Sequence, residues 1–483
     1  MNMWLAILGT LWLAMLAFFG LRSLRKTRGA DDYILAGSNI GMLLGLMTFA
    51  ATLFSTFTLM GMPDFFRNHG VGAWIFLAIS DGAMFFVIVW FGLHLRRRAA
   101  EKGFRGVAGL MSACYDNRWA GFACFAAVFL FLVPYVAIQV RGIAIFLSAV
   151  FPEALPAWGW SVAIVITMLL YSEVGGLRAI IYSDVLQGTI LLTVIWIIAI
   201  GCIRHFGGVE AMFRQVQVTN EALLSTPGPL GLFTLQFLIA SFLAIVMIPI
   251  TQPQVTTRLV IMRNTRLMQH KAVGLGVFTL LILLPTVAIG MYGAVHYADA
   301  STRDFLAGVL LFEQLDIIAA AVVIGLLAAA ISTADSQIFA LGTELRSLLS
   351  GDEQKVLIFT RIAIMFFGLA ALVFSILSSD ELVLLARVSF AGTSMVGPLI
   401  LAGILSPRPP GIEVIIAGAV GLLLFLASLL NLVPSMIGPL RLDLLLLLAI
   451  GAFTLASVLY RNYRFKTLDQ VTKVTDKDVN RGE

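Results

Sequence analysis

Charged residues are scarce in this sequence: Asp, Glu, Lys and Arg make up 12% of its 483 residues. Soluble domains carry about 25%, and 60% of the residues here are hydrophobic, so the composition indicates a polytopic membrane protein. Cysteine is rare as well. The three cysteines form neither a disulfide framework nor a CxxC metal-binding pair.

The sequence also lacks the short motifs of common catalytic machinery. There is no HExxH, no GxSxG and no Walker-type phosphate loop, so hydrolytic and nucleotide-driven reactions have no visible site. The first apolar stretch, 3–21, has no basic segment before it and no small-residue cleavage site, which predicts a retained helix rather than a signal peptide. We therefore expect a membrane protein that is not an enzyme.

Long apolar stretches are what the chain has in abundance. A helix of about 20 apolar residues crosses a bilayer. Windows of this length predict thirteen transmembrane helices, at 3–21, 40–66, 71–95, 119–150, 158–177, 181–204, 231–250, 272–297, 317–347, 356–378, 382–405, 412–433 and 440–460.

The segments between these helices differ in charge. Four are rich in Lys and Arg, namely 22–38, 96–118, 251–271 and the tail 461–483, whereas the alternate loops are poor in both. Because basic loops face the cytoplasm, the pattern places the N-terminus outside and the C-terminus inside a plasma or inner membrane. The net charge of +5 is thus a signal of topology and not of nucleic-acid binding, and the polar tail is expected to be solvated.

One predicted helix carries a polar face in apolar surroundings. In 328–345, AAAISTADSQIFALGTEL, one helix face is shared by Ala329, Ser332, Thr333 and Ser336, with Asp335 at its edge. A carboxylate inside a membrane helix costs about 3 kcal/mol even on a mild insertion scale. We therefore expect Asp335 to be functional, with a cation or a proton as its partner.

Three other stretches carry features that interrupt helices. Hydroxyl groups crowd the middle of 40–66, ahead of Gly61 and Pro63. This helix either opens near 51–54, freeing carbonyls for a hard cation, or continues with its hydroxyls bonded to the preceding turn. Pro249 and Pro253 interrupt the seventh helix. Two glycines at 175–176 end the fifth, and Asp184 on the next helix is either a ligand or an interfacial anion.

These stretches together resemble the sodium:solute symporter family, which includes the proline, pantothenate, monocarboxylate and sugar symporters. GGLRAIIYSDVLQ (175–187) is similar to the family signature of GGL followed by Asp and Gln, and AAAISTADSQIF (328–339) to a run on the family's ion-binding helix. Shorter similar segments, in the family's order, are DDYILAG (31–37), GMP (61–63), QPQVTTR (252–258) and VGPLILAG (396–403).

The resemblance implies a LeuT-like fold, an all-α polytopic membrane protein with an inverted five-plus-five helix repeat and two broken helices. The implied division has an extra N-terminal helix and loop at 1–39, a first repeat at 40–204, an extracellular loop at 205–230, a second repeat at 231–405, two additional helices at 406–460 and a cytoplasmic tail at 461–483.

The resemblance also implies Na+ as coupling ion and a site for it. The ligands carried over are the carbonyls of Ala51, Phe54 and Ala329 and the hydroxyls of Ser332 and Thr333. Some members hold a second cation on the signature Asp and nearby hydroxyls, which correspond here to Asp184, Ser332, Ser336 and position 335. Asp335 stands where those members have a hydroxyl, so the two carboxylates would hold either a second sodium or a proton.

The family's solute lies at the midplane between the broken helices. Candidate contacts are Ser55 and Thr56 beside the first break, Tyr135 and Gln139 on 119–150, and Gln252 at the second break. Arg141 would pair with a substrate carboxylate if it lies deep in its helix, and would reach a surface if it does not. Leu53 replaces the Asp of proline symporters, which disfavours proline.

The sequence thus predicts a secondary active transporter that imports a small organic solute, a carboxylate or an amino acid, together with sodium by alternating access. A sugar or other neutral solute is the second choice. Two alternatives stay open: a proton-coupled symporter, and a membrane sensor that binds a solute and signals through a partner protein.

Overall fold

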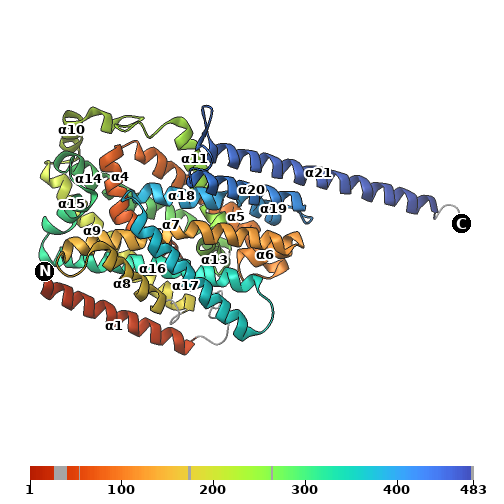
Figure 1. Cartoon of the computed structure of the whole chain (residues 1–483), viewed down its shortest axis with the longest axis horizontal. Coiled ribbons are helices and arrows are strands. Elements are labelled where there is room, and N and C mark those ends of the chain that lie inside the picture. Colours follow the sequence, from red (N-terminus) through yellow and green to blue (C-terminus); the bar gives the residue numbers. More distant parts are fainter. Residues whose placement is uncertain (27–40, 54, 172–175, 263–264, 480–483) are drawn as a thin grey trace.

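The structure is a computed structural model that describes residues 1–26, 41–53, 55–171, 176–262 and 265–479. These segments form one bundle of helices that run mainly along its long axis (Figure 1). A single short hairpin, in which β1 (Met436–Ile437) pairs with β2 (Leu440–Arg441), is the β structure within them.

The first half of the chain supplies helices α1 (Asn2–Lys26), α3 (Met42–Leu53), α4 (Met62–His69), α5 (Ser80–Lys102), α6 (Val107–Tyr115), α7 (Arg118–Val150), α8 (Ala157–Tyr171), α9 (Gly176–His205) and α10 (Val209–Thr219). The second half supplies α11 (Leu235–Val246), α12 (Ile248–Thr251), α13 (Pro253–Val260), α14 (Thr265–His296), α15 (Thr302–Ala307), α16 (Asp316–Leu348), α17 (Glu353–Leu377), α18 (Leu382–Ser394), α19 (Gly397–Leu405), α20 (Ile412–Leu429) and α21 (Leu442–Val479). Short π-helical segments η2 (Phe57–Gly61), η3 (Ile75–Ile79) and η5 (Gly308–Phe312) and the 3-10 turn η4 (Glu221–Leu224) connect them.

Nine of the predicted spans are present as long apolar helices. Eight helices of the described chain can cross a membrane by length and composition, and α18 with α19, bent by 43°, forms a ninth. Of the remaining predicted spans, 3–21 lies within the 25-residue helix α1, whereas 40–66, 158–177 and 231–250 hold shorter or interrupted helices. The polytopic all-helical fold is therefore confirmed, whereas the total of thirteen stays a prediction.

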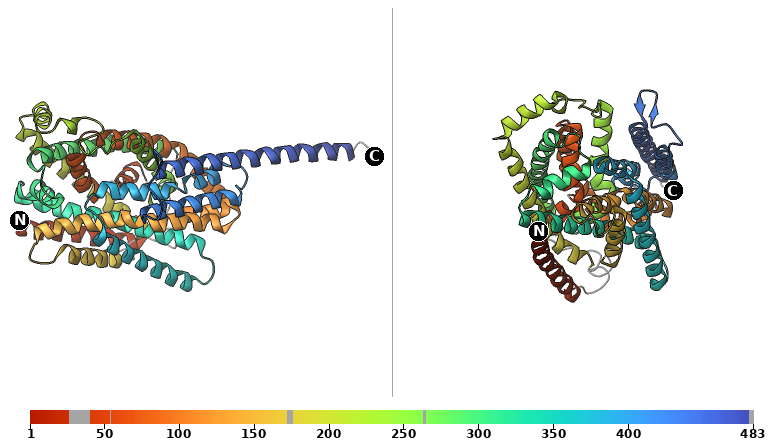
Figure 2. Two further views of the ribbon diagram at one scale, coloured as in Figure 1. Left: turned by 45° about the horizontal axis from the view of Figure 1, so that its top comes forward. Right: turned by 60° about the vertical axis from the view of Figure 1, so that its left-hand side comes forward.

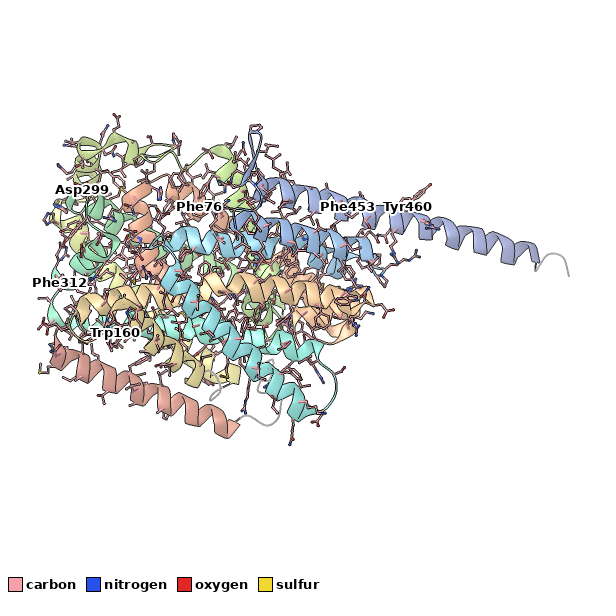
Figure 3. The ribbon with its side chains drawn as sticks, viewed as in Figure 1. Phe76, Trp160, Asp299, Phe312, Phe453 and Tyr460 are labelled. Atoms are coloured by element: carbon pink, nitrogen blue, oxygen red, sulfur yellow. The ribbon has the colours of Figure 1, made fainter. Side chains whose placement is uncertain are left out.

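The two ends of the bundle differ in the loops that they carry. Met1 lies at one end with α10 and α15, and α21 ends far beyond the other, where α6 lies (Figures 1 and 2). Figure 3 marks Asp299 and Phe312 at the first end and Tyr460 on the projecting part of α21. Helix α21 continues through the predicted polar tail to Val479. The sequence analysis predicts a solvated tail there and does not predict this helix.

Helix α16 lies at the centre of this arrangement. It packs against α7, α9, α3 and α13, and its long run of small residues, with Ala328 and Ala330 completely buried, lets those helices approach closely. Its polar face is thereby enclosed by helices from both predicted repeats.

Candidate cation and solute site

The first interrupted helix breaks where the hydroxyl groups accumulate. Helix α3 ends at Leu53, and π-helical η2 begins at Phe57, followed by α4. Phe54, one of the predicted sodium ligands, lies outside the described residues. The alternative of an uninterrupted α-helix through this stretch is wrong. Carbonyl groups near the end of α3 are therefore not committed to a continuing helix.

Two of the predicted sodium ligands meet across the bundle. The buried hydroxyl of Thr333 on α16 donates a hydrogen bond to the carbonyl oxygen of Ala51 on α3, with 3.3 Å between the oxygens. The contact holds both oxygens beside the break that follows α3. Ala329 and Ser332, the other predicted ligands on α16, are buried on the same helix face.

A second polar cluster surrounds the completely buried carboxylate of Asp184 on α9. The hydroxyl of Ser332 donates to Asp184 Oδ1, and the hydroxyl of Thr48 donates to Oδ2 at 2.5 Å. Arg258 Nη2 lies 3.2 Å from the same Oδ2. Asp184 is therefore buried, and both of its carboxylate oxygens accept hydrogen bonds. The alternative prediction, an interfacial anion, is wrong.

The structure corrects the prediction for Arg258. The sequence predicts a basic cytoplasmic loop at 251–271, yet the side chain of Arg258 is 1% exposed and belongs to α13. A guanidinium in a bilayer interior needs a partner, and Arg258 has Asp184 and the hydroxyl of Ser336, 2.9 Å from Nη2. The signal that pointed to it was its place at the end of QPQVTTR, directly after a helix break.

Asp335 lies beside this cluster. It is 2% exposed, and its Oδ1 atom has no hydrogen-bond partner among the described residues. Arg258 joins Asp184 to Ser336, and Asp335 is the residue before Ser336 on α16.

The second interrupted helix breaks at Gln252. Helices α11 and α12 run to Thr251, Gln252 has extended backbone angles (φ −96°, ψ 109°), and α13 starts at Pro253. The Gln252 amide donates to the hydroxyl of Thr393 on α18 at 3.0 Å and accepts from Gln254 at 3.0 Å. The predicted break is confirmed, and it places a polar side chain against α18.

The predicted solute groups gather around the first break and α7. Thr56 contacts Gly142, one turn beyond Gln139, because a Cβ added at Gly142 would lie 2.4 Å from its methyl group. Ser55 Oγ, Thr56 Oγ1 and Gln139 Oε1 are buried without hydrogen-bond partners in the described part of the chain. Such groups are costly unless a ligand or water satisfies them.

Tyr135 lines a narrow cavity next to these groups. Its walls come from η2, α4, η3, α5, α7, α11, α12 and α18. They include Asp81 and Arg387, which the sequence analysis does not predict for this site. The open space is about 30 Å³, room for roughly two water molecules. A solute would therefore enter only after the surrounding helices separate.

Two arginines of the predicted helices are held by acidic partners. Arg141 is half-buried and its Nε lies 2.8 Å from Asp380 in the loop before α18. Arg387 on α18 is buried, and it pairs with Asp443 at the start of α21 at 2.5 Å. In this conformation Arg141 faces a protein carboxylate.

The second part of the first interrupted helix, α4, is held by hydrogen bonds at the Met1 end of the bundle. Arg67 on α4 pairs with Asp64 at 2.8 Å and donates to the carbonyl oxygens of Tyr297 and Ala300 at 2.7 and 2.8 Å. Thr302 donates to Asp64 at 3.0 Å. These contacts join α4 to α15 and to the segment between α14 and α15.

Two interrupted helices that meet beside a buried polar helix face, inside a polytopic helical fold, define a secondary transporter. The sequence model of the sodium:solute symporter family matches residues 33–411. The chain belongs to this family, and the predicted resemblance is confirmed. The members that give this family its description are sodium:solute symporters, which are transporters.

Curated relatives are distant in sequence. A sodium/pantothenate symporter of Haemophilus influenzae is 24% identical over 328 residues, which cover 65% of each chain. The osmoregulated proline transporter OpuE of Bacillus subtilis is 22% identical over 417 residues, 82% of each chain. The aligned part thus spans just under two thirds of the pantothenate symporter.

Solved structures show the same fold. The substrate-bound, outward-open structure of a Na+-coupled sialic acid symporter is 17% identical, with a TM-score of 0.72 over 92% of this chain and 95% of the other. The structure of MhsT in complex with L-phenylalanine is 13% identical, with a TM-score of 0.54 over 84% and 98%. At these identities the likeness establishes the fold.

Proposed function

We propose that this protein imports a small carboxylate or amino acid together with sodium, with its N-terminus outside and its C-terminus in the cytoplasm. The observation that carries the proposal is the contact between Thr333 and Ala51, which joins the predicted sodium ligands of two distant helices. The relatives named for proline and pantothenate, an amino acid and a carboxylate, support the solute class. The basic segment 96–118 includes α6 and lies at the end opposite Met1, which supports the orientation.

The sodium ligands that we propose are the oxygens of Ala51, Phe54, Ala329, Ser332 and Thr333. They are neutral carbonyl and hydroxyl groups, and such a set holds a monovalent ion weakly enough for it to leave again. Sodium bound here would tie α3 to α16. The same helices border the solute groups, so that ion and solute favour each other's binding reciprocally.

The solute groups that we propose are Ser55, Thr56, Gln139, Tyr135 and Gln252. The first three each have a buried side-chain oxygen with no hydrogen-bond partner in the described part of the chain. They lie on both interrupted helices and on α7, and a solute held by all of them would close these elements on one another. We leave Arg141 out of this set and assign it, with Asp380, to the outer end of the solute path. Entry of the solute from that end requires the contacts of Arg67 to open.

The test is the thermal stability of the purified protein in sodium and in potassium, with a panel of carboxylates, amino acids and sugars. Ligands that bind the folded state raise the unfolding temperature. We expect a sodium-specific increase that one carboxylate or amino acid enlarges. A sodium effect that sugars enlarge would contradict the proposed solute class. The absence of any sodium effect would contradict sodium coupling and would favour a proton on Asp335. Binding without uptake in liposomes would favour the sensor.

A further inference from the structure

A long apolar groove lies on one side of the bundle, between α11, α19 and α21. Its open volume is about 580 Å³, and its lining is mainly aliphatic. Along α21 the lining runs from Leu447 to Asn462, a rise of about 22 Å. The hydrocarbon of one bilayer leaflet is about 15 Å deep, half of the full apolar core. The groove is therefore long enough to hold an acyl chain of one leaflet.

A polar pocket adjoins this groove at the end of α19. The two share the lining residues Leu405 and Pro407. The polar lining of the pocket comes from the last turns of α5 and consists of His94, Arg97, Arg98 and Glu101. Apolar space beside the bundle thus continues directly into a pocket that carries arginine side chains.

The two arginines of this pocket give it a net positive charge. Arg98 is fixed at the junction, because its Nε donates to the carbonyl oxygen of Ile404 at 3.2 Å and its Nη2 donates to that of Ser406. Arg97 is 83% exposed, and both arginines share the single carboxylate of Glu101, at 3.2 and 3.1 Å. Since a guanidinium group has five N–H donors, Arg97 keeps donors available for an anion.

We propose that the groove and the pocket together bind one anionic phospholipid, with its phosphate at Arg97 and Arg98 and an acyl chain along α21. Arginine pairs closely with phosphate oxygens, and basic pockets between transmembrane helices at the cytoplasmic face suit anionic headgroups. The proposal rests on the proposed function for its orientation, which places this end of the bundle at the inner leaflet. A second copy of the chain is a poorer occupant, because a two-fold interface would bring two identical positive pockets together.

A lipid in this position would contact helices that also border the solute cavity. The groove and the pocket involve α5 and α11, and both helices contribute to the walls of the cavity beside Tyr135. The lipid would join them to α19 and α21, which lie on the outside of the bundle. Because it would bind the folded arrangement, we expect it to raise the unfolding temperature.

The experiment measures the unfolding temperature of the purified full-length protein in a neutral detergent, titrated with phosphatidylglycerol or with zwitterionic phosphatidylcholine. Phosphatidylglycerol should bind more tightly, and the difference should shrink at high salt. Arg97→Gln should weaken phosphatidylglycerol binding about fivefold. The matched control is Arg214→Gln on α10, which also removes an exposed arginine paired with a glutamate four residues away, and it should behave like the wild type.

A second variant tests the groove itself. Gly451 lines the groove, and no atom of the described residues lies within 4 Å of its Cβ position, so Gly451→Leu would fill acyl-chain space without a clash. It should weaken phosphatidylglycerol binding, whereas Gly201→Leu, at a similarly open position on α9, should not. Equal wild-type affinity for the two lipids would overturn the proposal. Equal affinities within either pair of variants, Arg97→Gln with Arg214→Gln or Gly451→Leu with Gly201→Leu, would also overturn it.

The orientation has a separate test. The cysteines at 114, 124 and 202 are buried, so a cysteine introduced by Arg97→Cys can be labelled selectively. A membrane-impermeant maleimide should label it in inverted vesicles and not in intact cells. Labelling of intact cells would contradict the proposed orientation and the inner-leaflet position together. A missing preference for phosphatidylglycerol would contradict the lipid site alone, because that titration uses neither a sodium gradient nor a solute.

Discussion

The contact between Thr333 and Ala51 gives the most specific prediction. Thr333→Ala removes a completely buried hydroxyl that now bonds the Ala51 carbonyl and that we assign to sodium. An interaction of a polar group with a charged partner contributes about 1.5–3 kcal/mol, and each 1.4 kcal/mol is tenfold in affinity. Losing one ligand should therefore weaken sodium binding by about 10- to 150-fold.

The assay is the sodium concentration that gives half-maximal stabilisation of the purified protein. Thr333→Ser keeps the hydroxyl and should stay near the wild-type value. Thr343→Ala is the matched control, because Thr343 lies on the same helix and its hydroxyl bonds only the preceding turn among the described contacts, at Phe339. Equal sodium dependence of Thr333→Ala, Thr343→Ala and the wild type would refute the site assignment.

Two further predictions concern the helices around the site. Gly142→Ala should lower uptake and cost about 1–3 kcal/mol of stability, because the new Cβ would lie 2.4 Å from Thr56. The control is Gly201→Ala, which should be tolerated because nothing in the described part of the chain lies within 4 Å of its Cβ position. Equal uptake and equal unfolding temperatures of the two variants would contradict the packing. Glu344→Gln should lower the unfolding temperature, with a loss of about 1–3 kcal/mol in the free energy of unfolding. The reason is that the Glu344 carboxylate accepts hydrogen bonds from two backbone N–H groups at the start of α6, at 2.8 and 2.6 Å. An unchanged unfolding temperature would show that these hydrogen bonds contribute little.

The parts of the site that depend on local sequence were predictable. Helical spacing alone placed Ser332, Thr333 and Ser336 on one face, and the structure shows that face buried against other helices. Likewise, crowded hydroxyl groups and two prolines indicated where α3 and α12 end. Each of these features is a property of a few consecutive residues, so a single sequence is sufficient.

The parts that depend on pairing between distant segments were not predictable. The sequence places Arg258 in a loop, because a basic residue near a predicted helix end is normally exposed. Its partner Asp184 is 74 residues away, so nothing in the local sequence indicates the pair. Arg141 and Asp380 are 239 residues apart. Composition and periodicity describe which face of a helix is polar, whereas the choice of partner follows from the packing of the whole bundle.

The most direct test of the central claim is sodium-driven accumulation in proteoliposomes at zero membrane potential, with the solute that the stability panel selects. The account predicts that the solute accumulates when sodium is higher outside, and that an equal sodium concentration on both sides abolishes accumulation. Accumulation that is unchanged when potassium replaces sodium, or that follows only a proton gradient, would contradict it.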